Sequence, residues 1–109
     1  MNMSEKFMRL MVFFDLPVKT KEERRQATQF RNFLLQDGYY MLQYSLYARI
    51  CNTVENAKLH EERLKYHLPY KGSVRSLIIT EKQYSSISIL LGQKKKKDKK
   101  ITEGQLSFF

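Results

Sequence analysis

The chain has 109 residues, of which 20 are Lys or Arg and 11 are Asp or Glu, so its formal net charge is +9. This length fits one small domain and excludes large catalytic scaffolds such as a (β/α)₈ barrel. Hydrophobic residues make up 42% of the chain, which is enough for a packed core, so the chain is not a disordered polycation. The positive excess favours a polyanionic partner, either nucleic acid or an acidic membrane surface.

The positive charge is divided between two parts of the chain. Residues 92–109 contain six Lys against two acidic residues, a net charge of +4, and the preceding residues carry the other +5. Lysine runs of this kind are typically solvated. We therefore expect one folded domain over residues 1–92 and a lysine-rich tail with an apolar end over residues 93–109.

Cysteine content and apolar runs bear on the compartment. Cys51 is the only cysteine, which excludes an intrachain disulfide and a cysteine-rich metal cluster. A lone cysteine fits a reducing setting, so we expect a cytoplasmic protein. Residues 1–5 do not resemble the start of a signal peptide, and no apolar run approaches the roughly 18 residues that span a bilayer. We expect no membrane partner.

The first third of the chain predicts a strand followed by a helix. Residues 7–15 form a nearly unbroken apolar run, which is typical of a central strand buried on both faces, and Pro17 cannot continue it. Thr20 and Glu23 have the spacing of a helix capping box, so a helix begins there, runs to about residue 36 and stops at Gly38. Four apolar residues share its predicted inner face: Ala27, Phe30, Phe33 and Leu34.

The next segments predict two strands and a second helix. Residues 39–50 are rich in Tyr, Leu and Ile, which favours two strands joined by a tight turn at residues 43–45. Asn52 or Thr53 can cap a helix that closes before Pro69. The residues expected on its inner face are Val54, Ala57, Leu64 and Leu68.

Two further apolar runs complete the predicted fold. Residues 74–80 predict another strand, and residues 87–91 predict a short additional one that Gly92 ends. The element order is therefore β-α-β-β-α-β plus an extra C-terminal strand. This order predicts an α+β, ferredoxin-like split βαβ fold, with an antiparallel sheet and two helices on one face.

The predicted first helix carries a basic face opposite its apolar face. Such a face can follow nucleic-acid phosphates without reading bases. The alternative is a charged helix face that is only solvated. The candidate phosphate-binding residues, which include one from the preceding loop, are Lys19, Lys21, Arg24, Arg25 and Arg31.

Asp15 is the most informative acidic residue, because it lies at the carboxyl end of the first predicted strand. It could start the turn by accepting hydrogen bonds from nearby backbone N–H groups. It could instead be a catalytic carboxylate held for Mg²⁺, which uses one or two carboxylates, several waters and substrate phosphate oxygens. A twofold dimer would bring two copies of Asp15 together. The metal would then activate water for phosphodiester hydrolysis.

Aromatic residues occur in the middle of the chain and at its end. Tyr39, Tyr40, Tyr44 and Tyr47 could stack on bases, although packing within a sheet explains them as well and is the interpretation we favour. The apolar end of the tail could dock onto a partner by adding a strand, or could simply be frayed. The candidate partner-binding residues there are Leu106, Phe108 and Phe109.

Three segments, in this order, carry a resemblance to a known family. They are residues 13–17 (Phe-Phe-Asp-Leu-Pro), residues 38–47 (Gly-Tyr-Tyr-Met-Leu-Gln-Tyr-Ser-Leu-Tyr) and residues 71–75 (Lys-Gly-Ser-Val-Arg), which lead to residues 79–84 (Ile-Thr-Glu-Lys-Gln-Tyr). Together they resemble the small CRISPR-associated adaptation protein family, the dimeric partner of the spacer integrase. Within that family they are most similar to the branch from type II systems. The resemblance covers about residues 7–92.

The resemblance implies a ferredoxin-like homodimer in which Asp15 matches the family aspartate that binds Mg²⁺ across the dimer axis. Family members are described as metal-dependent endonucleases, or endoribonucleases, that act on RNA or DNA. In the adaptation complex the family dimer bridges two integrase dimers and holds the protospacer duplex, a role that does not need nuclease activity.

These considerations leave three expected functions. The first is a spacer-acquisition scaffold that binds double-stranded DNA through its backbone and associates with the integrase. The second is an Mg²⁺-dependent phosphodiesterase that uses Asp15 from both protomers. The third is a stand-alone metal-dependent ribonuclease or RNA-binding module of the same fold, which needs no integrase.

Overall fold

The computed structural model describes residues 7–92. The predicted tail, with the candidate residues Leu106, Phe108 and Phe109, lies outside the described residues. The elements, in chain order, are β1 (Met8–Asp15), α1 (Lys21–Gln36), β2 (Tyr40–Gln43), β3 (Leu46–Cys51), α2 (Val54–Lys65), β4 (Ser73–Thr80) and α3 (Glu81–Ser85). This order through β4 confirms the predicted ferredoxin-like α+β fold.

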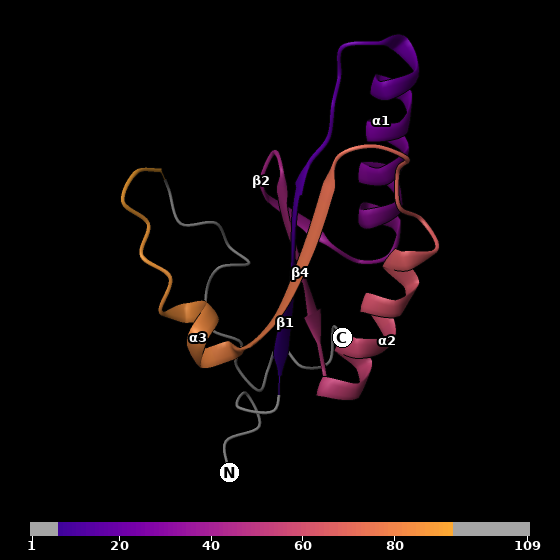
Figure 1. The fold of residues 1–109 in the computed structure, drawn as a ribbon. Helices are drawn as coiled ribbons and strands as arrows, with labels where there is room; N and C mark the ends of the chain where they lie inside the picture. Colours follow the sequence, from indigo (N-terminus) through magenta and orange to yellow (C-terminus); the bar gives the residue numbers. More distant parts are fainter. Residues whose placement is uncertain (1–6, 93–109) are drawn as a thin grey trace.

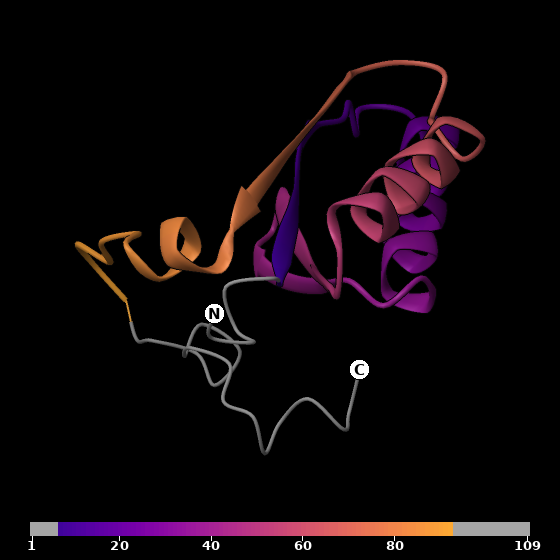
Figure 2. The ribbon, with the colours of Figure 1, turned by 90° about the horizontal axis from the view of Figure 1, so that it is seen from below.

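The four strands form one antiparallel sheet in the order β2-β3-β1-β4. The first strand is therefore central, as its apolar run predicts. Helices α1 and α2 cover one face of the sheet, and the short helix α3 lies on the other side (Figures 1 and 2). No helix within residues 7–92 is long and apolar enough to cross a membrane.

The main core lies between the sheet and the two long helices. Alternate residues of β1 are buried in this core: Leu10, Val12 and Phe14. Phe14 meets Phe30 of α1 edge to face, with ring centroids 5.3 Å apart. Tyr47 of β3 packs beside Phe14 at 5.5 Å. Sheet packing therefore accounts for this tyrosine, as expected.

Helix α1 begins and ends where the sequence predicts. The Thr20 hydroxyl accepts a hydrogen bond from the Glu23 backbone N–H, and the Glu23 carboxylate accepts one from the Thr20 N–H. These two bonds satisfy N–H groups that a helix start otherwise leaves unpaired. After the helix, Gly38 has a φ of +94°, a conformation that glycine adopts without steric cost. The chain then turns into β2.

Helix α2 is shorter than predicted. Thr53 caps it and Ala57 and Leu64 are buried, but Val54 is 39% exposed and Leu68 is 47% exposed. The prediction of an inner face that includes these two residues was wrong, because Val54 is the first residue of the helix and Leu68 follows in the loop after its end at Lys65. The buried inner face includes His60 instead.

His60 ties the two long helices together. Its Nδ1–H donates to the carboxylate of Asp37, the residue that follows α1, at 2.9 Å. Arg63 of α2 contacts the other oxygen of the same carboxylate at 2.9 Å. His67 stacks on Phe33 with ring centroids 3.8 Å apart. Both histidines thus serve helix packing.

The expected strand at residues 87–91 is absent from the described structure. Thr80 and Gln83 form a second capping box, so helix α3 begins directly after β4. The helix turns the chain away from the edge of the sheet, and residues 86–92 pair with none of the four described strands. Leu90 and Leu91 are 95% and 96% exposed.

Candidate nucleic-acid and metal site

The face of the sheet opposite α1 and α2 is only partly covered, and we call it the open face. Helix α3 covers one end, where Tyr84 packs with Met11 and Ala48. The other end is left apolar and accessible, since Phe13 is 39% exposed and Leu77 is 51% exposed. The side chains of the open face come from alternate positions of paired strands: Arg9, Met11, Phe13, Asp15, Leu46, Ala48, Ser73, Arg75, Leu77 and Ile79.

A buried ion pair anchors α3 on the open face. Arg9 is 0% exposed and Glu81 is 2% exposed. The guanidinium donates to both oxygens of the Glu81 carboxylate, at 2.7 and 2.5 Å. It also donates to the hydroxyl of Tyr40 and lies 4.0 Å from the ring centroid of Tyr84. Neither Arg9 nor Glu81 stands out in the sequence; the Thr80–Gln83 spacing was the available signal for α3.

Asp15 is the last residue of β1, at the uncovered end of the open face. Its carboxylate is exposed, and no residue from 7 to 92 forms a hydrogen bond or ion pair with it. The turn-capping alternative is therefore not found in the structure. An exposed carboxylate without protein partners fits a ligand of Mg²⁺, which keeps several waters.

The described residues of one chain do not form a metal site by themselves. Within residues 7–92, no group of three or more His, Cys, Asp or Glu side chains could hold a metal ion. Among residues 7–92, Asp15 is the candidate ligand at this end of the sheet, so a site made of two such carboxylates would require two copies of the chain.

Gly72 holds the start of β4 against Asp15. Its φ is +104°, and a Cβ at this position would lie 2.5 Å from the Asp15 carbonyl oxygen and 2.9 Å from the Leu16 side chain. Only glycine fits this close approach without strain. The register then places Ser73 opposite Asp15.

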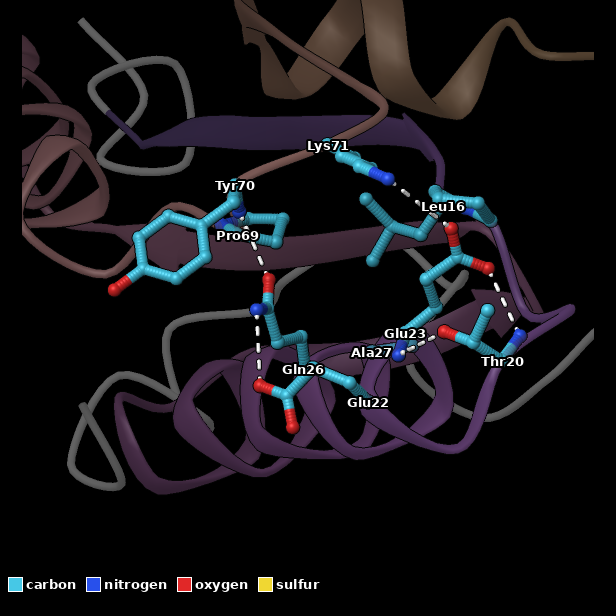
Figure 3. Close-up of a pocket in the computed structure, with 10 residues that line it drawn as sticks. Leu16, Thr20, Glu22, Glu23, Gln26, Ala27, Pro69, Tyr70 and Lys71 are labelled. Carbon is cyan, nitrogen blue, oxygen red and sulfur yellow. Dashed lines mark hydrogen bonds and ion pairs between the residues drawn. The ribbon is translucent and has the colours of Figure 1, made fainter.

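A cavity of about 230 Å³ lies behind this junction, between α1 and the loop that leads to β4 (Figure 3). Its polar groups bind one another. The Glu23 carboxylate accepts from the backbone of Thr20 and lies 3.8 Å from Nζ of Lys71, and Gln26 accepts from the Tyr70 N–H at 2.9 Å. The backbone hydrogen bonds lower the pKa of Glu23. The contacts around the cavity therefore hold the loop before β4 against α1, next to Asp15.

The predicted basic residues divide into two groups. Lys19 and Lys21 are exposed, and no carboxylate in the described part of the chain lies within 4.0 Å of either. Arg24 donates to the carbonyl oxygens of Val18 and Lys19, at 3.1 and 3.0 Å, so it stiffens the loop before α1. The two lysines are therefore exposed cations of the set that no described acidic side chain pairs with.

The other two arginines of the set contact protein groups. Arg25 donates to both carboxylate oxygens of Glu22, at 2.8 and 2.5 Å, and these bonds, with one from Gln26, lower the pKa of Glu22 to about 2. Arg31 does not lie on the outer face as the helical spacing predicts. Its guanidinium is 4.0 Å from the ring centroid of Tyr44, because its long side chain reaches sideways to the turn between β2 and β3.

The architecture, together with the exposed Asp15 carboxylate at the end of β1, defines a class of protein. It is a small ferredoxin-like domain with a candidate metal-binding aspartate at the end of its first strand. The sequence model of the family described as CRISPR associated protein Cas2 matches residues 8–87, nearly all of the folded part. The chain belongs to the CRISPR-associated Cas2 family.

Curated relatives carry the same family name. A protein of Acidovorax ebreus named CRISPR-associated endoribonuclease Cas2 is 49% identical over 94% of this chain and 100% of its own length. A protein of the same name from Ligilactobacillus salivarius is 48% identical over 88% of this chain and 95% of its own. The Campylobacter jejuni protein of that name is 46% identical over 96% of this chain and 73% of its own.

Proposed function

We propose that this protein acts in CRISPR adaptation, where its homodimer bridges integrase dimers and binds the protospacer duplex through the DNA backbone. The observation that carries this proposal is membership of the Cas2 family over nearly all of the folded part of the chain. The open face supports the dimer, because Phe13 and Leu77 leave an apolar surface that a second copy would remove from water.

Lys19 and Lys21 are the proposed principal phosphate contacts, with Arg24, Arg25 and Arg31 as further contributors. A captured duplex has arbitrary sequence, so its recognition should depend on phosphates and not on base edges. The affinity should therefore fall steeply as salt rises, and different sequences should bind alike.

The test is the affinity of a labelled DNA duplex across a salt series. The double variant K19Q/K21Q should bind more weakly than the wild type and should show a smaller salt dependence. The matched control is K58Q, which removes an exposed lysine from α2. Affinity that barely changes between about 50 and 200 mM salt would contradict the electrostatic basis of the proposal.

Association with the integrase separates this proposal from a stand-alone ribonuclease or RNA-binding module. The full chain should co-purify with a CRISPR integrase that is expressed together with it. Deletion of residues 93–109, which removes Leu106, Phe108 and Phe109, should weaken that association. Co-purification that survives the deletion unchanged would remove the tail from the interface, and no association with the intact chain would favour the stand-alone function.

A second candidate function is metal-dependent hydrolysis of RNA, favoured by the exposed Asp15 carboxylate and by the names of the curated relatives. Asp15 of each protomer would hold Mg²⁺, which when bound polarises the phosphate and activates water. The remaining open face would exclude water around the site once a second copy covers it. D15N preserves the shape of the side chain and should abolish Mg²⁺-dependent cleavage; equal cleavage by the wild type and D15N would exclude Asp15 from the chemistry.

A further inference from the structure

Arg75 lies on the open face beside Asp15. The register of β1 and β4 pairs Asp15 with Ser73 and Phe13 with Arg75. Opposite residues of antiparallel strands point to the same side of a sheet, so Asp15 and Arg75 are diagonal neighbours on one face. Gly72 holds this end of β4 tightly against Asp15.

Arg75 differs from the other arginines in having no partner among the residues that the structure describes. The chain contains seven arginines, and the other six each contact a protein group: Arg9 binds Glu81, Arg24 the carbonyls of Val18 and Lys19, Arg25 Glu22, Arg31 the ring of Tyr44, Arg49 the carbonyl of Asp37, and Arg63 the carboxylate of Asp37. Within residues 7–92, no acceptor or aromatic ring engages the guanidinium of Arg75, which is exposed.

The surroundings of Arg75 suit an anionic ligand. Phe13 and Leu77, its neighbours on the open face, are apolar and partly exposed. In the proposed dimer a second copy would cover these two residues and exclude water beside Arg75, and charge–charge interactions strengthen where water is excluded. A carboxylate such as Asp15 repels a phosphodiester, and an adjacent cation offsets that repulsion. A guanidinium is suited to the task because its planar fork donates two parallel hydrogen bonds to a phosphate.

We propose that Arg75 is a phosphate-binding residue, whose guanidinium holds the phosphodiester of an RNA strand against the Asp15 end of β1. This inference rests on the proposed ribonuclease function. Lys71 is a weaker candidate for the same role, because its Nζ lies 3.8 Å from the Glu23 carboxylate. The competing occupant is a carboxylate of a second copy, and the experiment separates the two.

The test measures the affinity of the full-length protein for a fluorescein-labelled single-stranded RNA in Ca²⁺, over a salt series. R75Q should weaken binding about tenfold, the effect of removing a charge-assisted hydrogen bond. The logarithm of the association constant falls linearly with the logarithm of the salt concentration, and the slope of that line is the salt slope. R75Q should reduce the salt slope by about 0.7 for each phosphate that the variant no longer neutralises. R75K should retain the slope and bind somewhat more weakly, because lysine keeps the charge without the planar fork. K58Q is the matched control and should match the wild type.

The outcomes distinguish the inference from the function on which it rests. If R75Q binds RNA as the wild type does while D15N abolishes cleavage, Arg75 is not the phosphate ligand and the ribonuclease function stands. If R75Q weakens binding while D15N cleaves normally, Arg75 is supported and Asp15 chemistry is not. If R75Q changes only the dimer dissociation constant in analytical ultracentrifugation, the partner is a carboxylate of the second copy and the inference is overturned. A wild type that binds no RNA overturns both.

Discussion

The buried pair of Arg9 and Glu81 offers the sharpest test of how the structure is held together. Replacing Glu81 with glutamine keeps the shape of the side chain and removes its charge. Arg9 would then remain 0% exposed without its counter-charge. Burial lowers the pKa of Arg9, but in the wild type the hydrogen bonds of Glu81, with the charges of Tyr40, Glu81 and Tyr84, make the net shift upward. Arg9 stays charged in the variant as well, because an arginine guanidinium is not deprotonated in proteins.

The size of the effect follows from the geometry. Both oxygens of the carboxylate accept from the guanidinium, at 2.7 and 2.5 Å, and the two side chains are 0% and 2% exposed. Removing one partner of such a buried pair costs about 3–5 kcal/mol, because the other charge is left uncompensated. That is a large part of the roughly 5–15 kcal/mol by which a typical domain is stable. Replacing both residues together, as in R9M/E81L, should cost much less, since neither charge is then stranded.

Urea unfolding followed by circular dichroism measures these differences, at one fixed protein concentration because a dimer would make stability concentration-dependent. The control is E62Q, which breaks the exposed pair of Glu62 and Lys65 and should cost less than about 1 kcal/mol. If E81Q is no more destabilising than E62Q, the buried pair does not stabilise the fold and the role assigned to it is wrong. If R9M/E81L is as unstable as E81Q, the cost comes from packing and not from the stranded charge.

Three further predictions concern other parts of the molecule. G72A should lose about 2 kcal/mol or more of stability in urea, because the φ of +104° is strained for alanine and its Cβ would lie 2.5 Å from a backbone oxygen; G92A, with a φ of +114° but no close contact, should lose less. Glu22 should titrate at about pH 2 in NMR, and R25Q should return its pKa toward 4.5. Because the folded pKa is the lower one, the stabilising effect is complete above the ordinary value and is lost as the pH falls toward 2; an unchanged pKa in R25Q would contradict this assignment. Cys51 is 0% exposed and burial raises its pKa, so a thiol reagent should react with it only after unfolding, and rapid reaction of the native protein would contradict the packing.

Features that depend on neighbours in the chain were predictable from the sequence. The capping box of Thr20 and Glu23 and the stop at Gly38 set the ends of α1, and the turn near residues 43–45 divides β2 from β3. Each depends on hydrogen bonds or backbone angles within a few residues, so composition and spacing suffice. Asp15 was found for the same reason, because a carboxylate that directly follows an apolar strand is visible in the sequence.

The sequence by itself determined the element order through β4 and the ferredoxin-like fold, and it singled out the end of β1 as the candidate place for chemistry. Only the tertiary structure decided which charges are available there. Arg9 and Arg75 both lie on strands of the same face, yet one is buried against Glu81 and the other has no partner within residues 7–92. Arg31 fits the helical pattern of an outer residue and packs against Tyr44 instead. These differences arise from contacts between residues far apart in the chain, which the pattern along the sequence does not encode.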